Sequence, residues 1–132
     1  MSEQILIVDD QPDLAGLMAD VLSDAGYQTR VAENGRVALH EVQADPPDLL
    51  LLDAQMPEMD GFELASMLKA DPMTATIPII MVSANEGRGA RLIGLESGAE
   101  DYMTKPVDPV ELIAKIRNLL LLRKRAAHAL IH

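Results

Sequence analysis

The sequence predicts a single α/β sandwich built on a parallel β-sheet. Its 132 residues are about the length of one domain. Short apolar runs alternate five times with segments whose apolar residues follow helical spacing. Neither an internal repeat nor a structureless stretch of roughly 20 residues interrupts this alternation. We therefore expect one layered domain in which each strand is followed by a helix.

The first strand and helix are expected directly after the N-terminus. The apolar run from Gln4 to Val8 is typical of a strand buried on both faces. Pro12 suits the first turn of a helix, and Gly26 suits its end. Between them, apolar residues recur three and four positions apart and mark one helical face: Leu14, Leu17, Met18, Val21 and Leu22.

The second unit and the third strand follow the same pattern. Tyr27 to Ala32 resembles a strand, and the next helix is expected to begin near Asn34 and to end before Pro46. Leu49 to Leu52 is an uninterrupted apolar run, which indicates a third buried strand. This strand is closed by Asp53, as the first one is closed by aspartates.

The second half of the chain is expected to continue the alternation after a loop from Ala54 to Gly61, which is rich in turn-forming residues. The predicted strands are residues 79–82 and 102–104, and the predicted helices are residues 62–70 and 90–97. Pro109 opens a last helix with an apolar stripe that reaches Leu122. We expect this helix to continue into the basic residues that follow.

The composition excludes several classes of protein. No apolar stretch approaches the roughly 18 residues of a membrane-spanning helix, and no signal peptide precedes the first strand, so we expect a cytoplasmic protein without membrane association. The absence of cysteine excludes disulfides, thiolate catalysis and cysteine-based zinc sites. A net charge of −10 and only three aromatic residues argue against direct nucleic-acid binding.

Polar side chains stand where the predicted strands end. Asp9 and Asp10 follow the first strand, and the third, fourth and fifth strands are followed by Asp53, Ser83 and Lys105. Because ligands of such sheets bind beyond the carboxyl ends of the strands, we expect these side chains to share one edge. Three neighbouring carboxylates repel one another unless a cation joins them. Oxygen ligands without histidine or cysteine favour Mg²⁺, with Mn²⁺ as an alternative.

Five short motifs resemble the receiver domain of two-component response regulators, including chemotaxis regulators. They are Val8-Asp9-Asp10, Leu52-Asp53 with Met56-Pro57-Glu58-Met59-Asp60-Gly61, Val82-Ser83-Ala84, Gly98-Ala99, and Asp101-Tyr102-Met103-Thr104-Lys105-Pro106. They occur in the order found in that family. The resemblance implies a flavodoxin-like (βα)5 sandwich, with a five-stranded parallel sheet in the order 2-1-3-4-5 and helices on both faces. It implies a receiver domain over residues 1–122, followed by a C-terminal helix extension or the start of a linker over residues 123–132.

The resemblance further implies a phosphoacceptor switch of a two-component phosphorelay. Asp53 would accept the phosphoryl group of a sensor histidine kinase or a histidine phosphotransfer protein. Asp9 and Asp10 would hold Mg²⁺ together with Asp53 and the backbone carbonyl of Gln55. Lys105 would pair first with Asp53 and then with the phosphoryl group. Such a chain is not a conventional enzyme, since it catalyses its own phosphorylation and dephosphorylation.

The same resemblance assigns a conformational switch. Ser83 would turn toward the phosphoryl oxygens and open space for Tyr102 to swing inward, which changes the surface of the fourth helix, fifth strand and fifth helix. Gln55 and Asn85 occupy positions that influence how fast the phosphoryl group is lost. The peptide bond between Lys105 and Pro106 is expected to be cis.

Two other functions fit parts of this pattern. A Mg²⁺-dependent phosphohydrolase would also use an aspartyl-phosphate intermediate on a similar sheet. Haloacid-dehalogenase-like enzymes, however, carry a second aspartate where Gln55 stands, and they need a cap that 132 residues leave no room for. The other alternative is a pseudo-receiver used only to bind proteins, although the site residues here are intact. Expected partners besides the kinase are an output domain or a downstream protein, and the apolar stripe of the last helix would suit a homodimer contact.

Overall fold

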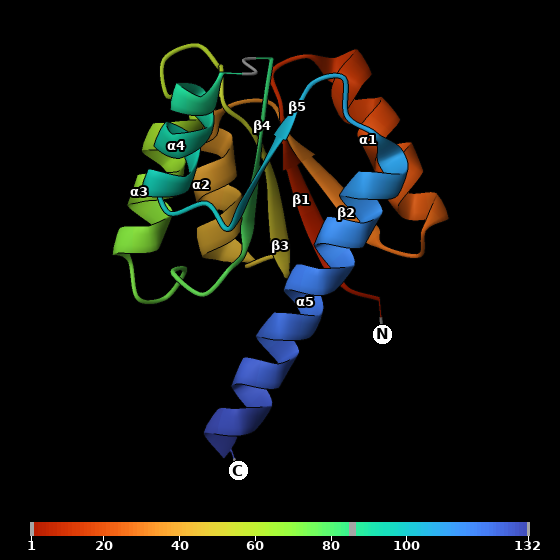
Figure 1. Cartoon of the computed structure of the whole chain (residues 1–132), viewed down its shortest axis with the longest axis vertical. Helices are drawn as coiled ribbons and strands as arrows, with labels where there is room; N and C mark the ends of the chain where they lie inside the picture. The colour runs from red at the N-terminus through yellow and green to blue at the C-terminus, as the bar shows by residue number, and fades with distance from the viewer. Residues whose placement is uncertain (1, 85–86, 132) are drawn as a thin grey trace.

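A computed structural model describes residues 2–84 and 87–131 and confirms the predicted fold (Figure 1). Five parallel strands form one sheet in the order β2-β1-β3-β4-β5. The strands are β1 (Gln4–Val8), β2 (Gln28–Ala32), β3 (Leu49–Asp53), β4 (Ile79–Ser83) and β5 (Asp101–Thr104). The helices are α1 (Pro12–Asp24), α2 (Gly35–Ala44), α3 (Gly61–Ala70), α4 (Arg88–Glu96) and α5 (Pro109–Ile131). Their ends lie within about two residues of the predicted ones, except that α5 continues through the expected basic residues 123–125 to Ile131.

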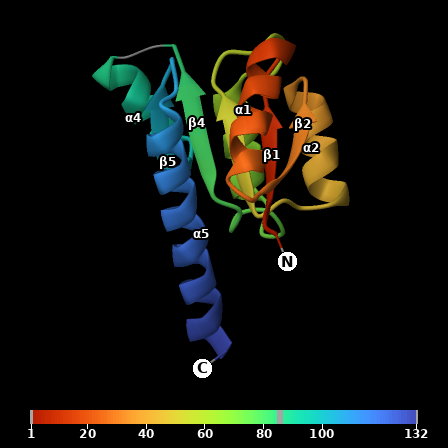
Figure 2. The same cartoon turned by 90° about the vertical axis from the view of Figure 1, so that its right-hand side faces the viewer.

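The helices cover the sheet from both sides, so that the sheet is the middle of three layers (Figure 2). One apolar core lies between the sheet and α1 and α5, and the other lies between the sheet and α2 and α3. In β1, Ile5 and Ile7 belong to the first core, whereas Leu6 and Val8 belong to the second. Because side chains of a strand alternate between faces, burial on both faces explains why β1, β3 and β4 consist mainly of apolar runs.

Helix α5 reaches beyond the sheet and ends away from the body of the domain (Figure 1). Its first half is anchored by Leu112, Ile116 and Leu120, which are buried in the core shared with α1. Leu121 and Leu122, which follow directly, are exposed. In the described part of the chain, none of the helices combines the length and the apolar character needed to cross a membrane.

Lys69 stabilises the edge of the sheet at which the strands begin, opposite the edge that carries the predicted site. Its Nζ donates hydrogen bonds to the carbonyls of Ala75 and Ile77, over 3.0 and 2.7 Å, and also pairs with the carboxylate of Glu100. The other oxygen of Glu100 accepts the N–H of Ile79 over 2.6 Å. One ammonium group therefore joins the segment before β4 to the segment before β5.

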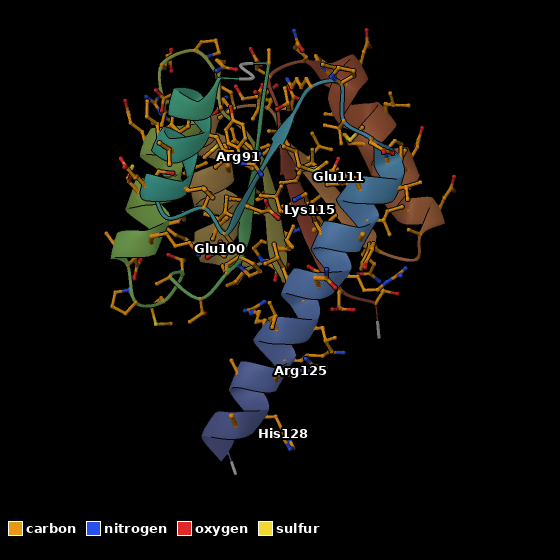
Figure 3. All side chains as sticks on the ribbon, in the orientation of Figure 1. Arg91, Glu100, Glu111, Lys115, Arg125 and His128 are labelled. Carbon is orange, nitrogen blue, oxygen red and sulfur yellow. The ribbon has the colours of Figure 1, made fainter. Side chains whose placement is uncertain are left out.

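A Lys69→Met variant is expected to lower the free energy of unfolding by about 2 kcal/mol. Methionine keeps the apolar stem but leaves two carbonyls and a carboxylate without their charged donor. Urea denaturation measures the loss. Lys115→Met is the control, because the ammonium of Lys115 pairs with Asp101 and Glu111 near the surface and is expected to contribute less than about 1 kcal/mol (Figure 3). Equal losses in the two variants would contradict the role given to Lys69.

Candidate functional site

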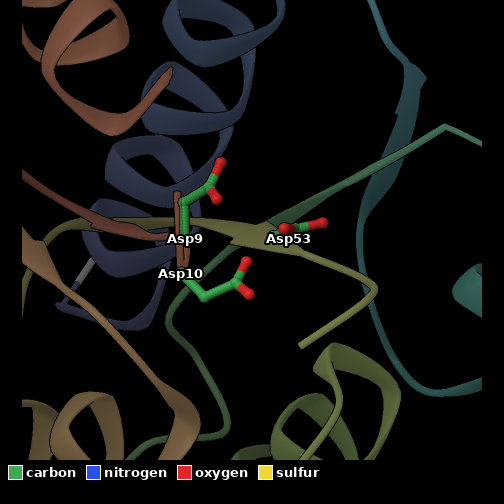
Figure 4. Close-up of side chains that lie close together, drawn as sticks. All are labelled: Asp9, Asp10 and Asp53. Carbon is green, nitrogen blue, oxygen red and sulfur yellow. The ribbon is translucent and has the colours of Figure 1, made fainter. Parts of the chain in front are cut away.

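Three carboxylates gather at the carboxyl ends of β1 and β3. Asp9 and Asp10 follow β1, and Asp53 is the last residue of β3. The two strands are direct neighbours in the sheet, so these side chains emerge side by side (Figure 4). One carboxylate oxygen from each of the three lies within 4.8 Å of the others. Asp9 and Asp53 are buried, whereas Asp10 is exposed, so the cluster opens to solvent on one side.

Lys105 brings a positive charge to this cluster from the end of β5. Its backbone N–H donates to the carbonyl of Ser83 over 2.8 Å, which holds the start of the following loop against β4. The Nζ atom lies 3.5 Å from Oδ2 of Asp53 and 3.9 Å from Oδ2 of Asp9. The peptide bond between Lys105 and Pro106 is cis. One ammonium thus faces two carboxylates of a cluster of three, which leaves a net negative charge.

Burial raises the pKa of the Asp53 carboxyl group above its ordinary value. The ammonium of Lys105 acts in the opposite direction, as does the N–H of Gln55, which donates to Oδ1 of Asp53 over 3.2 Å. The neighbouring carboxylate of Asp9 raises the pKa further. A divalent cation would offset both the repulsion between the carboxylates and the free-energy cost of burying their negative charge. The acidic cluster, made of oxygen donors alone, therefore fits a magnesium site.

The hydroxyl group of Ser83 lies at the end of β4 and faces the side chain of Gln55. Ser83 is fully buried, whereas Gln55 is exposed. The Nε2 of Gln55 donates to Oγ of Ser83 over 3.0 Å, and Oγ donates to Oε1 of Gln55 over 3.2 Å. The amide of Gln55 therefore lies over the hydroxyl. Asn85, the second residue expected to tune dephosphorylation, lies outside the described residues.

The ring of Tyr102 is buried between β5 and α4, with 3% of the residue exposed. Gly94 of α4 provides the space, because a Cβ atom there would lie 2.7 Å from Cδ2 of Tyr102. The buried ring and the hydrogen bonds between Ser83 and Gln55 are present in the same structure. Burial of the ring therefore does not require Ser83 to leave Gln55.

Sequence reasoning missed Gly61, which lets α3 begin directly against the end of β3. A Cβ atom at Gly61 would lie 2.3 Å from the carbonyl oxygen of Asp53 and 2.9 Å from Cα of Ala54. The N–H of Gly61 donates to the carbonyl of Ala54 over 2.9 Å. The sequence marked Gly61 as a turn residue, but the close approach became visible only in three dimensions.

Sequence reasoning also missed an apolar cavity of about 380 Å³ beside the cluster. It borders Asp9, Asp53 and Lys105 and is lined on the α1 side by Leu14 and Leu17, which are partly exposed. The signal for it was present in the stripe of leucines on α1. Leu14 and Leu17 belong to that stripe, and both flank an opening next to Asp53.

Comparison with known proteins places this geometry in one family. The family model described as the response regulator receiver domain matches residues 5–117. The response regulator PleD of Caulobacter vibrioides is 45% identical over 119 residues, which are 90% of this chain and 26% of PleD. The phosphate regulon transcriptional regulatory protein PhoB of Pseudomonas aeruginosa is 45% identical over 121 residues, which are 91% of this chain and 52% of PhoB. The chain thus spans about a quarter of one relative and about half of the other.

Solved structures agree with the sequence relatives. The signal receiver domain of a histidine kinase from Syntrophus aciditrophicus has a TM-score of 0.85 and 39% identity, and the match covers 90% of each chain. A CheY-like receiver domain protein from Methanospirillum hungatei has a TM-score of 0.88 and 27% identity, and the match covers 96% of this chain and 99% of the other. The chain therefore belongs to the family of response regulator receiver domains.

Proposed function

We propose that the chain is a cytoplasmic phosphoacceptor switch, which takes a phosphoryl group from a sensor histidine kinase or a histidine phosphotransfer protein onto Asp53. The observation that carries this proposal is the buried carboxylate of Asp53, which lies beside two further carboxylates and 3.5 Å from the ammonium of Lys105. Because PleD and PhoB extend beyond the matched region, an output domain or a separate downstream protein would read the change.

In the proposed reaction, a carboxylate oxygen of Asp53 attacks the phosphorus of the donor and the bond to the leaving group breaks. Asp9, Asp10 and Asp53, with the backbone carbonyl of Gln55, would hold Mg²⁺, which when bound supplies positive charge to the phosphoryl oxygens. Lys105 would move its ammonium from the carboxylates to a phosphoryl oxygen. The hydroxyl of Ser83 would donate a hydrogen bond to another phosphoryl oxygen. The protein positions these groups, and it contributes no further covalent step.

The first test is the intact mass of the chain after incubation with Mg²⁺ and acetyl phosphate or phosphoramidate. We expect a gain of one phosphoryl group. No gain is expected when EDTA is present during the incubation, because the transfer needs Mg²⁺. If no adduct forms, binding of beryllofluoride distinguishes two cases. Binding would indicate an acyl phosphate that hydrolyses before it is measured, whereas no binding would make the chain a pseudo-receiver and overturn the proposal.

A Lys105→Met variant is expected to be phosphorylated about a hundredfold more slowly by a small donor. The ammonium stabilises negative charge on the transferring group, and removing one such preorganised donor usually slows catalysis by about this factor. The rate of mass gain measures the effect. Lys115→Met is the control, since it removes the same charge from the neighbouring α5 and should keep the wild-type rate. A similar slowing in both variants would assign the effect to net charge instead.

A further inference from the structure

The apolar cavity beside the acidic cluster has the size and the lining of a site for a small ligand. Its volume of about 380 Å³ falls within the range of roughly 300–1,000 Å³ that is common for such sites. Ile7, Leu51 and Val82 line it from three neighbouring strands, and they belong to the core shared with α1 and α5. Leu14 and Leu17 line it from α1. The cavity therefore lies where this core meets the edge of the sheet that carries the site.

The charged groups that border the cavity are those of the proposed phosphorylation site. They are Asp9, Asp53 and Lys105. The Nζ atom of Lys105 lies 3.5 Å from Oδ2 of Asp53, so a phosphoryl group that bonds to Asp53 and pairs with Lys105 borders the cavity as well. The group attached to phosphorus before the transfer is then next to the same apolar space.

The rest of the lining is apolar and favours a hydrocarbon over water. Water in such a space finds few hydrogen-bond partners. Leu14 and Leu17 are partly exposed, so a ligand that covers them removes apolar surface from water. The cavity thus fits the hydrocarbon body of an amphipathic molecule whose phosphoryl group lies at the charged end.

We infer that the cavity receives the hydrocarbon part of a small phosphodonor, so that the chain prefers acyl phosphates with a longer alkyl chain to acetyl phosphate. The inference rests on the proposed function and deepens it, because it names the chemical class of the donor. A carboxylate oxygen of Asp53 forms the bond to phosphorus while the bond from phosphorus to the acyl oxygen breaks. The acyl group leaves as a carboxylate with the electron pair of that bond. The alkyl chain contributes binding energy alone.

A comparison of butyryl phosphate with acetyl phosphate in the presence of Mg²⁺ tests the inference, because both donors have the same reacting atoms and differ by two methylene groups. We expect the wild-type chain to react about tenfold faster with butyryl phosphate, measured as the second-order rate constant. Phosphoramidate, whose leaving group holds no carbon, gives the reference rate. Release of the carboxylate or of ammonia in the first turnover, with EDTA as the blank, counts each transfer even when the acyl phosphate is hydrolysed at once.

A Leu17→Gln variant connects the preference to the cavity. Glutamine places a polar group on its α1 side and is a good helix former. We expect the ratio of the butyryl to the acetyl rate constant to fall to about three or less, and the phosphoramidate rate to stay unchanged. Leu14→Gln should act in the same way. Leu121→Gln is the matched control, because Leu121 of α5 is 44% exposed, against 55% for Leu17, but does not line the cavity. It should keep the wild-type ratio.

Three results would overturn the inference and leave the proposed function in place. They are a wild-type ratio near one, a preference for butyryl phosphate that both Leu14→Gln and Leu17→Gln retain, and an equal fall of the ratio in Leu17→Gln and Leu121→Gln. In each case acetyl phosphate would still phosphorylate Asp53. If none of the three donors released its leaving group and beryllofluoride did not bind, the proposed function would fail and the inference with it.

Discussion

Asp53→Asn is expected to gain no phosphoryl group under conditions in which the wild-type chain gains one, and to be more stable than the wild type in the absence of metal. The amide lacks the carboxylate oxygen that would attack phosphorus, so the loss should be complete. It also removes a buried negative charge that lies within a cluster of three carboxylates. Intact mass measures the first effect, and thermal unfolding in EDTA measures the second.

The direction of the stability change follows from the raised pKa of Asp53. Burial makes the pKa of this group higher in the folded chain than in the unfolded one. Between these two values the folded chain binds more protons than the unfolded chain, so the free energy of unfolding falls as the pH rises through this window. Above the raised pKa of the folded chain this contribution is lost. Asp53→Asn is therefore expected to add about 1 kcal/mol at pH 7 and little below the ordinary pKa of aspartate.

Two comparisons complete this experiment. Asp101→Asn is the control, because Asp101 is also a strand aspartate but begins β5 and pairs with Lys115 outside the cluster. It should still be phosphorylated and should not gain stability. Added Mg²⁺ should stabilise the wild type more than Asp53→Asn, since the variant lacks one charged ligand. An Asp53→Asn chain that still gained a phosphoryl group would place the acceptor on another residue.

The positions of the strands along the chain and most of the charged site residues could be predicted because they depend on local sequence. Each buried strand is an apolar run with a polar residue directly after it, and parallel strands bring such residues to one edge. The placement of Asp9, Asp53 and Lys105 at one edge of the sheet could therefore be predicted from the fold alone, without knowledge of side-chain packing. The family resemblance added the strand order, which the structure confirms.

Contacts that depend on distances between elements could not be predicted. The hydrogen bonds between Gln55 and Ser83 join residues 28 positions apart, and they require the exact reach of one side chain over a neighbouring strand. The space that Gly94 leaves for Tyr102 depends on how closely α4 approaches β5. A glycine in a helix suggests weak local structure when it is seen in sequence alone. In three dimensions this glycine allows an aromatic ring to be buried.

Gly61→Ala is expected to lower the free energy of unfolding by about 3 kcal/mol and to slow phosphorylation of Asp53. The added Cβ would lie 2.3 Å from the carbonyl oxygen of Asp53 and 2.9 Å from Cα of Ala54. Both are backbone atoms, which cannot turn aside as a flexible side chain can, so α3 or the end of β3 must move. A shift of the Asp53 backbone also shifts its carboxylate relative to Lys105. Urea denaturation and the rate of mass gain measure the two effects.

Gly35→Ala is the matched control, because Gly35 also begins a helix and is also buried. Its added Cβ would meet the side chain of Met59, with 3.0 Å to the sulfur, and methionine can adjust at little cost. We expect a loss below about 1 kcal/mol and an unchanged rate of phosphorylation. Equal stability of the two variants would mean that the loop after Asp53 yields to the added methyl group. In that case the close approach of α3 to β3 would not be what positions Asp53.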